Sequence, residues 1–411
     1  MSIKLLILAD DLTGAADTAM QFASAGIASA VSLGDGLPLS NPSVAVLSVD
    51  TETRHLPPLD AFRRVVSIVQ TARMAGINRF YKKIDSTFRG NVGAELEALI
   101  QAASADQLIL VPAFPRGGRT TRDGNQYVHG VLLQESAFSR DPLEPMTGSS
   151  IPSILARQTP FPVHCIDRVA FESFTIQNER RPGIFCFDAE SDRDLIAIGK
   201  RCAAGDGLRI MAGSAGFAAI LPEVLSLQRT TVILPKFHER LFVVNGSLND
   251  VSVAQVAMAR QRGIFCAYLH PEEADRNIWR DDAVVGALVE PIVHHLNAQG
   301  RALFSTPAKP FEGPSPAACA AALGQVVAAV LEQVPDVNLA VFGGDTAFSV
   351  CKAIGAELLY PVAEIEPGCT VCSRNRSHAS GAVLVKSGGF GSRDIIGSIE
   401  TYISQGSNDR Q

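Results

Sequence analysis

The sequence predicts an α/β protein made of two domains, each with a mostly parallel sheet covered by helices. Three observations lead to this fold class. The chain has 411 residues, which is more than a single hydrophobic core usually organises. Short apolar runs alternate with amphipathic stretches along its length, as expected of successive strands and helices. The alternation pauses at the polar stretch 227–240 and restarts at a new apolar run, so we place the domain boundary there.

The first domain, residues 1–230, follows a broadly βαβα order. Its apolar runs predict strands at 3–9, 44–49, 78–84, 107–112, 183–188 and 208–212. Helical periodicity predicts helices at 14–25, 58–75, 92–104, 191–204 and 215–226. The segment from Pro112 to Gly148 departs from this order, because it is too long and polar for an ordinary connection. Long ordered loops often carry function, so we expect a functional role for it.

The second domain, residues 238–411, is predicted to be a separate α/β unit. Its expected strands are 241–246, 264–269, 302–305, 339–342, 370–373 and 382–386. Its expected helices are 251–262, 276–299, 315–333, 346–355 and 394–403. No internal repeat of 20 to 50 residues is evident, which argues against a solenoid or a propeller.

Composition excludes several classes of protein. The formal net charge of −6 argues against a nucleic-acid or anionic-membrane partner, which would require an extended basic face. No apolar run approaches the roughly 18 residues of a membrane helix. Eight cysteines, mostly isolated in apolar segments, suggest reduced core residues in a cytoplasmic protein. Cys369 and Cys372 form a CxxC, but neither a second pair nor nearby histidines complete a zinc site, so we expect no zinc and assign no residue to a metal.

Two junctions in the first domain join a strand to a polar turn and a helix, where open α/β sheets bind ligands. Asp10 and Asp11 end strand 3–9, and we expect one of them to bind a substrate hydroxyl or accept a proton. The alternative is a helix N-cap beside a solvated carboxylate. A haloacid-dehalogenase-like site would need its second aspartate where Leu12 stands.

The second junction crowds positive charge and hydroxyl groups before helix 92–104. It contains Lys82, Lys83, Asp85, Ser86 and Arg89. This composition at a helix start predicts a carboxylate or phosphate site, and the alternative is a solvated basic turn. Lys82 and Lys83 should point to opposite faces of a strand, so at most one is expected in the site. Arg54, after strand 44–49, adds a second cation at the same sheet edge.

Two glycine-rich junctions lie in the second domain. In the first, Gly343 and Gly344 precede Asp345 and Thr346 at the start of a helix. In the other, Lys386 and Ser387 precede three glycines, Gly388, Gly389 and Gly391. Glycines let the backbone approach a phosphate, although the same pattern also occurs in tight turns without a ligand. Neither junction is a Walker A or a dinucleotide motif.

Together these motifs resemble the four-carbon acid-sugar kinase family, which includes D-threonate, D-erythronate and 3-oxo-tetronate kinases. The resemblance covers nearly the whole chain and includes ADDLTGAAD, TETRHL, KKIDSTFRGNVGAEL, PAFPRGGRTT, AGSAGFA, VNGS, GGDTA and VKSGGFG. It implies an N-terminal domain that binds a sugar acid and a C-terminal domain that binds ATP, the phosphoryl donor. An active site in the cleft between the two domains and a Mg²⁺ ion bridging the phosphates are expected with it.

The resemblance also implies roles for individual residues. The substrate site is expected to contain Asp10, Asp11, Arg54, Lys83, Asp85, Ser86 and Arg89. The ATP site is expected to contain Ser247, Gly343, Gly344, Asp345, Thr346, Gly388, Gly389 and Gly391. We expect Arg54 and Lys83 to hold the carboxylate, and Asp11 or Asp85 to take the proton of the terminal hydroxyl as its 4-phosphate forms.

Two rival functions remain at this stage. A non-catalytic sugar-acid sensor would use nucleotide only as a regulator, but intact glycines in both C-terminal turns argue against it. A nucleotide-dependent ligase is the other, and a dehydrogenase would lack its dinucleotide fingerprint. A homodimer is the default expectation for a cytoplasmic enzyme with a small-molecule substrate.

Overall fold

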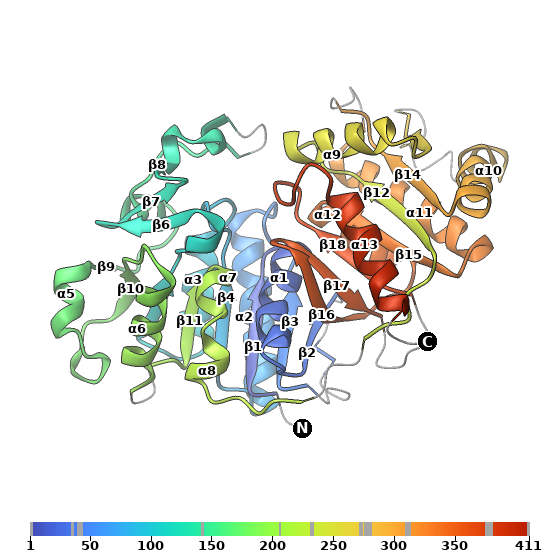
Figure 1. Cartoon of the computed structure of the whole chain (residues 1–411). Helices are drawn as coiled ribbons and strands as arrows, with labels where there is room; N and C mark the ends of the chain where they lie inside the picture. The colour runs from blue at the N-terminus through green and yellow to red at the C-terminus, as the bar shows by residue number, and fades with distance from the viewer. Residues whose placement is uncertain are drawn as a thin grey trace. The chain divides into compact units, whose positions relative to one another are not determined.

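The chain forms two compact units, Met1–Thr231 and Val232–Gln411, which confirm the predicted α/β class (Figure 1). The computed structural model describes residues 3–33, 37–38, 44–140, 144–204, 207–230, 234–270, 274, 282–308, 314–374 and 381–408. Each unit has its own sheet and its own hydrophobic core, so each is described by itself.

The first unit is built on a sheet whose strands run in the order β2-β3-β1-β4-β11-β5-β10-β9, with every pairing parallel. The strands are β1 (Leu5–Ala9), β2 (Ser29–Ser32), β3 (Val46–Asp50), β4 (Phe80–Lys83), β5 (Gln107–Val111), β9 (Val163–Ile166), β10 (Gly183–Phe187) and β11 (Ile210–Gly213). The helices are α1 (Leu12–Ser24), α2 (Pro58–Met74), α3 (Val92–Ala102), α4 (Ile151–Leu155), α5 (Arg168–Ser173), α6 (Asp192–Ala203), α7 (Ala215–Ala218) and α8 (Leu221–Val224).

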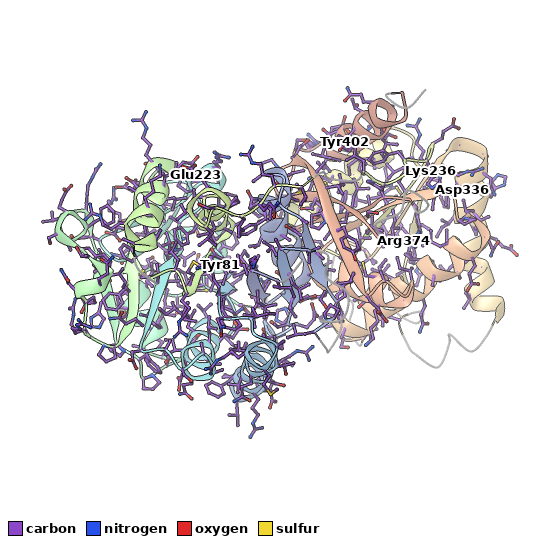
Figure 2. The ribbon with its side chains drawn as sticks, turned by 90° about the horizontal axis from the view of Figure 1, so that it is seen from below. Tyr81, Glu223, Lys236, Asp336, Arg374 and Tyr402 are labelled. Carbon is purple, nitrogen blue, oxygen red and sulfur yellow. The ribbon has the colours of Figure 1, made fainter. Side chains whose placement is uncertain are left out.

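Helices cover both faces of this sheet. Figure 2 shows α2 and α3 together on one face, and α1 with α6 and α7 on the other. A parallel sheet covered in this way buries its strands on both sides, which is why all five residues of β1 are buried and apolar. Tyr81 of β4 is fully buried and donates a hydrogen bond of 2.5 Å to the carbonyl oxygen of Ser214. The hydrophobic core therefore extends to the middle strands of the sheet.

Strand order places a switch point beside β1. The chain runs from β1 to β2 and β3 on one side, and then crosses to β4 on the other. In open α/β sheets, ligands bind beside such a switch point, at the carboxyl ends of the strands. The first two junctions identified in the sequence, after β1 and after β4, lie at this edge of the sheet.

The segment 112–148 contains a small antiparallel sheet that the sequence did not predict. Its strands are β6 (Arg119–Arg122), β7 (Asn125–Val128) and β8 (Val131–Leu132). Asp123 and Gly124 form the first turn, both with positive φ, at 50° and 68°. An Asp-Gly pair of this kind is a common signal for a tight hairpin. The segment is therefore an ordered insertion with strands of its own.

The predicted helix 215–226 is two short helices, α7 and α8, and the prediction of one continuous helix was wrong. Pro222 lies in the first turn of α8. Proline has no N–H to donate to the preceding turn, so it begins a helix more easily than it continues one. Strands β2 and β9 were also not predicted, because β2 begins and ends with serine and β9 contains His164, so neither is an apolar run.

The second unit has the strand order β13-β14-β12-β15-β18-β17-β16. Its strands are β12 (Arg240–Asn245), β13 (Cys266–Tyr268), β14 (Arg301–Ser305), β15 (Val337–Phe342), β16 (Leu358–Glu366), β17 (Cys369–Ser373) and β18 (Val383–Lys386). Its helices are α9 (Asp250–Gln261), α10 (Asp282–Gln299), α11 (Pro316–Gln333), α12 (Gly344–Ala353) and α13 (Ile395–Asn408). The first five strands in this order are parallel, and β17 is antiparallel to both of its neighbours.

Strand β16 is absent from the prediction for the second unit, and only part of helix α10 can be compared with it. Strand β16 was not predicted, because Pro361 lies inside it, at a shift in the pairing register. The predicted helix 276–299 is observed from Asp282, and its first six residues lie outside the described part of the chain.

Helix α11 corrects the expectation that no segment resembles a membrane helix. Among the described helices it alone has the length and apolar composition of a membrane span, with a mean hydropathy of 1.3. Small residues raise this value without a long run of large apolar side chains. However, α11 packs against α10 and α12, and Leu323, Val326 and Val327 are fully buried. It is therefore a core helix of the second unit.

None of the eight cysteines, all of which lie in the described residues, forms a disulfide. Cys369 and Cys372 both lie in β17, where they are fully buried. Burial raises the pKa of Cys369 to about 12, so its thiol keeps its proton at neutral pH. Within the described residues, no three His, Cys, Asp or Glu side chains are grouped to hold a metal ion.

Candidate functional site

Four polar residues of the first unit meet at the carboxyl ends of three neighbouring strands. Asp10 and Asp11 directly follow β1, Arg54 lies in the turn after β3, and Lys83 is the last residue of β4. Because β3 and β4 flank β1, these residues lie at one edge of the sheet. These four residues, which the sequence predicted for one site, therefore lie near one another in the structure.

Arg54 forms ion pairs with both aspartates. Its Nε lies 2.7 Å from Oδ2 of Asp10, and its Nη1 lies 2.7 Å from Oδ2 of Asp11. Burial alone would lower the pKa of Arg54, but the charges of the two aspartates raise it well above its ordinary value. One guanidinium therefore lies between two adjacent carboxylates and reduces the repulsion between them.

Asp11 also caps helix α1. Its Oδ1 accepts the backbone N–H of Gly14 at 2.8 Å, and its Oδ2 accepts the hydroxyl of Thr13 at 2.9 Å. The N-cap considered from the sequence is thus present. It does not exclude a chemical role, because the cap fixes the carboxylate at the start of a helix beside the sheet edge.

Asp10 is not the solvated neighbour that the alternative interpretation required, since it is only 3% exposed. Burial pushes the pKa of Asp10 upward, but the charges of Arg54, Lys82 and Lys83 outweigh it, so that this pKa lies below its ordinary value. Its Oδ1 has no hydrogen-bond partner among the described residues. A buried, ionised oxygen without a donor is a place for a substrate hydroxyl.

The two lysines of β4 point to opposite faces, as alternation along a strand predicts. Lys83 extends over the start of α1, where a Cβ added to Gly14 would lie 2.9 Å from its Nζ. Lys82 is fully buried on the other side, with its Nζ 3.2 Å from Oε2 of Glu95 in α3. Only Lys83 therefore shares the space in front of Asp11 and Gly14.

Asp85 accepts hydrogen bonds at both carboxylate oxygens. Thr87 donates to Oδ2 through its backbone N–H and its hydroxyl. Arg89 donates to Oδ2 through its backbone N–H and its Nε, and to Oδ1 through its Nη2 at 3.1 Å. Burial would raise the pKa of Asp85, but the charges of Arg89 and Arg54 and these hydrogen bonds hold it well below the usual range. Such a carboxylate is a weak base, and this arrangement favours a role in positioning Arg89. Ser86 joins the insertion instead, because its carbonyl oxygen accepts from Nε2 of Gln126 at 2.7 Å.

Sequence reasoning missed two charged residues of this site. Arg119, on β6 of the insertion, is 8% exposed, and its guanidinium and that of Arg89 both lie over the ring of Phe138, at 5.8 and 5.4 Å. Asp50 ends β3, and burial together with the charges of Glu52 and Asp11 raises its pKa well above the ordinary value. Asp50 occupies a strand end like Asp10, so the same positional argument applied to β3 would have found it.

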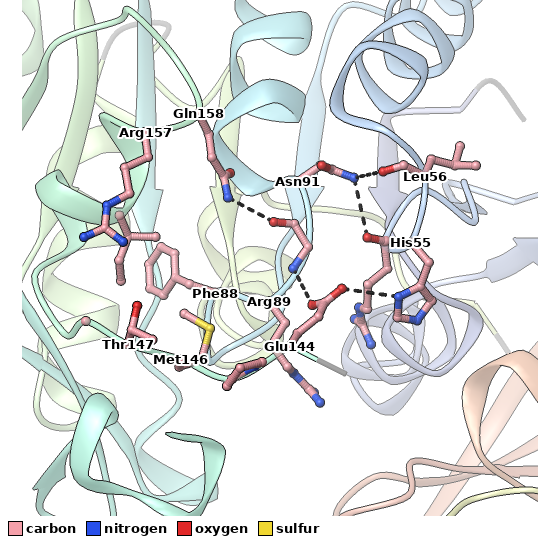
Figure 3. A pocket seen from close by; sticks show the side chains of 15 residues that line it. His55, Leu56, Phe88, Arg89, Asn91, Glu144, Met146, Thr147, Arg157 and Gln158 are labelled. Atoms are coloured by element: carbon pink, nitrogen blue, oxygen red, sulfur yellow. Dashed lines mark hydrogen bonds and ion pairs between the residues drawn. The ribbon is translucent and has the colours of Figure 1, made fainter. Parts of the chain in front are cut away.

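A pocket of about 430 Å³ lies beside Arg54 and Arg89 (Figure 3). Arg157 also lines it, so that three guanidinium groups border one space. Glu144 closes one side: Oε2 accepts the N–H of Gly90 at 2.8 Å, and Oε1 lies 3.3 Å from Nδ1 of His55. The pocket is predominantly basic, and this favours an anionic ligand.

In the second unit, three loops converge at the carboxyl ends of β12, β15 and β18, which are neighbours in the sheet. Ser247 lies between the two glycine turns. A Cβ added to Gly343 would lie 3.4 Å from Cβ of Ser247, and one added to Gly388 would collide with its Oγ. The residues that the sequence predicted for a nucleotide therefore share one region, comprising Ser247, Gly343, Gly344, Asp345, Thr346, Gly388, Gly389 and Gly391.

Helix α12 begins in this region without a side-chain cap. Gly343 precedes it with a φ of 105°, a conformation that favours glycine. The first N–H groups of a helix have no partners within it, so here they can donate to an anion. The arrangement suits a phosphate group, which needs several donors and little side-chain volume.

Comparisons with known proteins match one family model to each part of the chain. A family model described as a sugar-binding N-terminal domain matches residues 5–221, and one described as a nucleotide-binding C-terminal domain matches residues 242–396. The chain is 30% identical to a D-threonate kinase of Salmonella typhimurium, over 98% of this chain and 99% of that one. It is also 30% identical to a 3-oxo-tetronate kinase of Burkholderia multivorans, over 95% of each chain.

The fold is also found in a crystal structure. A Salmonella typhimurium protein, provisionally described as a tRNA synthase, superposes with a TM-score of 0.77 over 97% of this chain and 98% of that one. The two sequences are 22% identical, and at this level the likeness shows the fold alone.

Proposed function

The chain belongs to the four-carbon acid-sugar kinase family, and from this premise we propose that it transfers the γ-phosphoryl group of ATP to the terminal hydroxyl of a four-carbon sugar acid. It is a phosphotransferase with an alcohol group as acceptor. The product is then the 4-phosphate. The candidate acids are D-threonate, D-erythronate and 3-oxo-tetronate, since relatives named for each of them match this chain.

One observation carries the proposal: Asp10, Asp11, Arg54 and Lys83 lie together at the switch point of a parallel sheet. A sugar acid carries one carboxylate and several hydroxyls, so it needs cations and hydrogen-bond acceptors within a few ångströms of each other. Lys83 supplies a cation, and Oδ1 of Asp10 supplies an unused acceptor. This combination supports a small hydroxylated acid as the ligand of the first unit.

The reaction moves one proton and one phosphoryl group. The terminal hydroxyl oxygen bonds to the γ-phosphorus, the bond from that phosphorus to the leaving ADP oxygen breaks, and the hydroxyl proton passes to a carboxylate. We assign this base to Asp11, because its carboxylate accepts fewer hydrogen bonds than that of Asp85 and lies beside Lys83 at the sheet edge. Asp85 stays the second candidate from the sequence, although its filled hydrogen bonds favour the positioning of Arg89.

The second unit supports ATP as the donor. Its glycine turns and the start of α12 present backbone donors, and Ser247 lies between them. Mg²⁺ usually binds through phosphates and one or two carboxylates, so it does not require a cage of protein ligands. Asp345, exposed in the first turn of α12, is the residue that fits this role. Bound there with ATP, the ion would neutralise phosphate charge.

Three expectations remain proposals. Phosphoryl transfer requires the acid and the γ-phosphate to meet, and the cleft between the two domains stays a prediction. A homodimer is the common state of enzymes of this size, and light scattering in solution would test it. Eight cysteines without a disulfide fit a reducing compartment such as the cytoplasm.

The test is a coupled assay of ADP release with Mg-ATP and each of the three acids. We expect release with at least one acid, and phosphorus NMR should show the product phosphate coupled to the protons on carbon 4. Asp11→Asn serves as the inactive control. A protein that releases ADP with none of the acids, or that phosphorylates another carbon, would contradict the proposal.

A further inference from the structure

Lys386 is a buried cation below the last glycine turn. It ends β18 and is 1% exposed. Its Nζ donates to the carbonyl oxygens of Ser387 at 2.9 Å, Phe390 at 3.1 Å and Gly388 at 3.4 Å. It also donates to Oγ of Ser252 at 3.2 Å. Lys386 forms no ion pair with any residue in the described part of the chain.

Helix α9 holds the same loop from a second direction. Oγ of Ser252 donates to the carbonyl oxygen of Gly388 at 2.8 Å. Nε2 of Gln255 donates to the carbonyl oxygens of Phe390, Gly391 and Ser392, at 3.1, 3.2 and 2.8 Å. The carbonyl groups of this turn are therefore drawn toward Lys386 and α9.

This arrangement fixes the direction of the glycine amides. In a trans peptide the C=O and the following N–H point in opposite directions. Because the carbonyls of Ser387, Gly388 and Phe390 face Lys386, the N–H groups that follow them, those of Gly388, Gly389 and Gly391, face away from it. These three N–H groups have no acceptor among the described residues. They form a concave set of donors of the kind that binds anions.

We infer that Lys386 is the positioning residue of the nucleotide's phosphate site: it turns the amides of Gly388, Gly389 and Gly391 toward the phosphates and places an unpaired positive charge beneath them. The inference rests on the proposed function, because it assumes that the second unit binds a nucleotide. The inference goes beyond the proposed function, because it gives the buried Lys386 a role in the affinity for the nucleotide and in the pH dependence of that affinity.

The charge of Lys386 supports this role. Burial lowers its pKa to about 8, and the nearby Cys369 and Glu366 offset only part of that effect. The ring of Phe342 lies 4.6 Å from its Nζ on the side of the sheet. A bound polyphosphate favours the charged form and raises this pKa again, so binding above pH 8 takes up a proton. Below that pH the lysine is already charged, and affinity no longer changes through this group.

Calorimetric titration of the full chain with ADP tests the inference. At pH 7 and pH 9, each titration is run in two buffers with different ionisation enthalpies, which measures the protons taken up on binding. ADP itself is fully ionised at pH 9, because its last phosphate pKa lies near 6. For the wild type we expect uptake approaching one proton at pH 9, and an affinity about tenfold lower at pH 9 than at pH 7.

Lys386→Met should bind ADP at least about tenfold more weakly at pH 7 and should lose both the proton uptake and the pH dependence. Lys386→Arg, which keeps its charge at every pH, should retain more affinity than Lys386→Met and likewise lose the pH dependence. Lys352→Met, at an exposed position of α12, is the matched control and should behave as the wild type.

Two results would overturn the inference: no proton uptake by the wild type at pH 9, or an unchanged affinity in Lys386→Met. The first measurement needs no variant, so it decides the matter even where Lys386→Met does not fold. Failure of the proposed function is a different result, because the wild type would then not bind ADP at pH 7 at all.

Discussion

The two candidate sites present different chemical groups to their proposed ligands. In the first unit the site consists of charged side chains, with Arg54 paired to Asp10 and Asp11 at the end of β1. In the second it consists of backbone amides and glycines around Ser247, with the charge of Lys386 hidden below the loop. A sugar acid must be recognised by both acceptors and cations, whereas a polyphosphate needs donors and close approach. The chemistry of each ligand thus accounts for the composition of each site.

The difference has a consequence for substitutions. The first site is sensitive to the removal of a charge, because the removal leaves a buried partner of opposite sign without its ion pair. The second is sensitive to the addition of a carbon atom, because its glycines lie against neighbouring side chains. Substitutions in one site should leave binding at the other unchanged.

Asp11→Asn should have the largest effect on turnover. The amide oxygen can still cap α1, so the fold should persist, but the base is lost. We expect kcat to fall by about 10² to 10⁴ while ADP affinity stays unchanged. Steady-state kinetics and ADP titration measure the two quantities, and Asp106→Asn, at an exposed position, is the matched control.

A parallel variant at the other candidate base sharpens this test. Asp85→Asn should raise KM for the acid more than it lowers kcat, because it releases Arg89. The assignment of the base to Asp11 is wrong if Asp85→Asn has the larger loss of kcat.

Arg54→Met should destabilise the first unit. It leaves Asp10 and Asp11 without their ion pair, which costs about 3–5 kcal/mol for a buried pair. In the wild type the lowered pKa of Asp10 contributes stability above its ordinary pKa of 3.8, which is lost as the pH falls. The variant lacks this contribution, so its deficit should be full at pH 7 and shrink as the pH falls below 3.8, toward pH 3.

Urea unfolding at both pH values measures this deficit. The control is Arg63→Met, whose ion pair with Asp60 is exposed and worth less than about 1 kcal/mol. An equal deficit at pH 3 and pH 7 would show that the loss of packing, and not of charge, explains the effect.

Gly388→Ala should weaken the nucleotide site alone. The added Cβ would collide with Oγ of Ser247, and overpacking of this kind costs about 1–3 kcal/mol, or roughly thirtyfold in ADP affinity at the middle of that range. KM for the acid should not change. Gly286→Ala is the control, because nothing lies within 4 Å of the added atom. Equal ADP affinity in the two variants would remove this turn from the site.

Asp50→Asn should have the smallest effect, and of opposite sign. Burial and the charges of Glu52 and Asp11 raise the pKa of Asp50, so the wild type loses stability as the pH rises from the ordinary pKa of 3.8 through this higher value. A neutral amide avoids that loss and should stabilise the fold by about 1 kcal/mol at pH 8. Thermal unfolding at pH 5 and pH 8 checks it: the gain should grow with pH, and a gain that is constant would contradict the cause.

Much of the fold follows from the sequence because strands buried on both faces are largely apolar runs, as in β1. The places where the sequence misled are those with mixed signals. Strand β2 begins and ends with serine, and β16 contains Pro361. Helix α11 is apolar through alanine, which does not distinguish a core helix from a membrane span.

The candidate sites were predictable as locations but not as arrangements. Carboxyl ends of neighbouring strands must lie together, which places Asp10 beside Arg54 although they are 44 positions apart. Which oxygens pair, and which remain unused, depends on side-chain geometry that no motif records. Arg119 illustrates the limit, because a functional role was expected for its insertion but the position of its side chain could not be predicted.

The most direct test of the division of labour is a crossed titration of the full chain. Calorimetry would measure the affinity of ADP and of the preferred acid for the wild type, Arg54→Met and Gly388→Ala. Arg54→Met should lose acid binding and keep ADP binding, while Gly388→Ala should do the reverse. If either variant lost both ligands while remaining folded, or if Arg54→Met lost only ADP, the assignment of one ligand to each unit would be wrong.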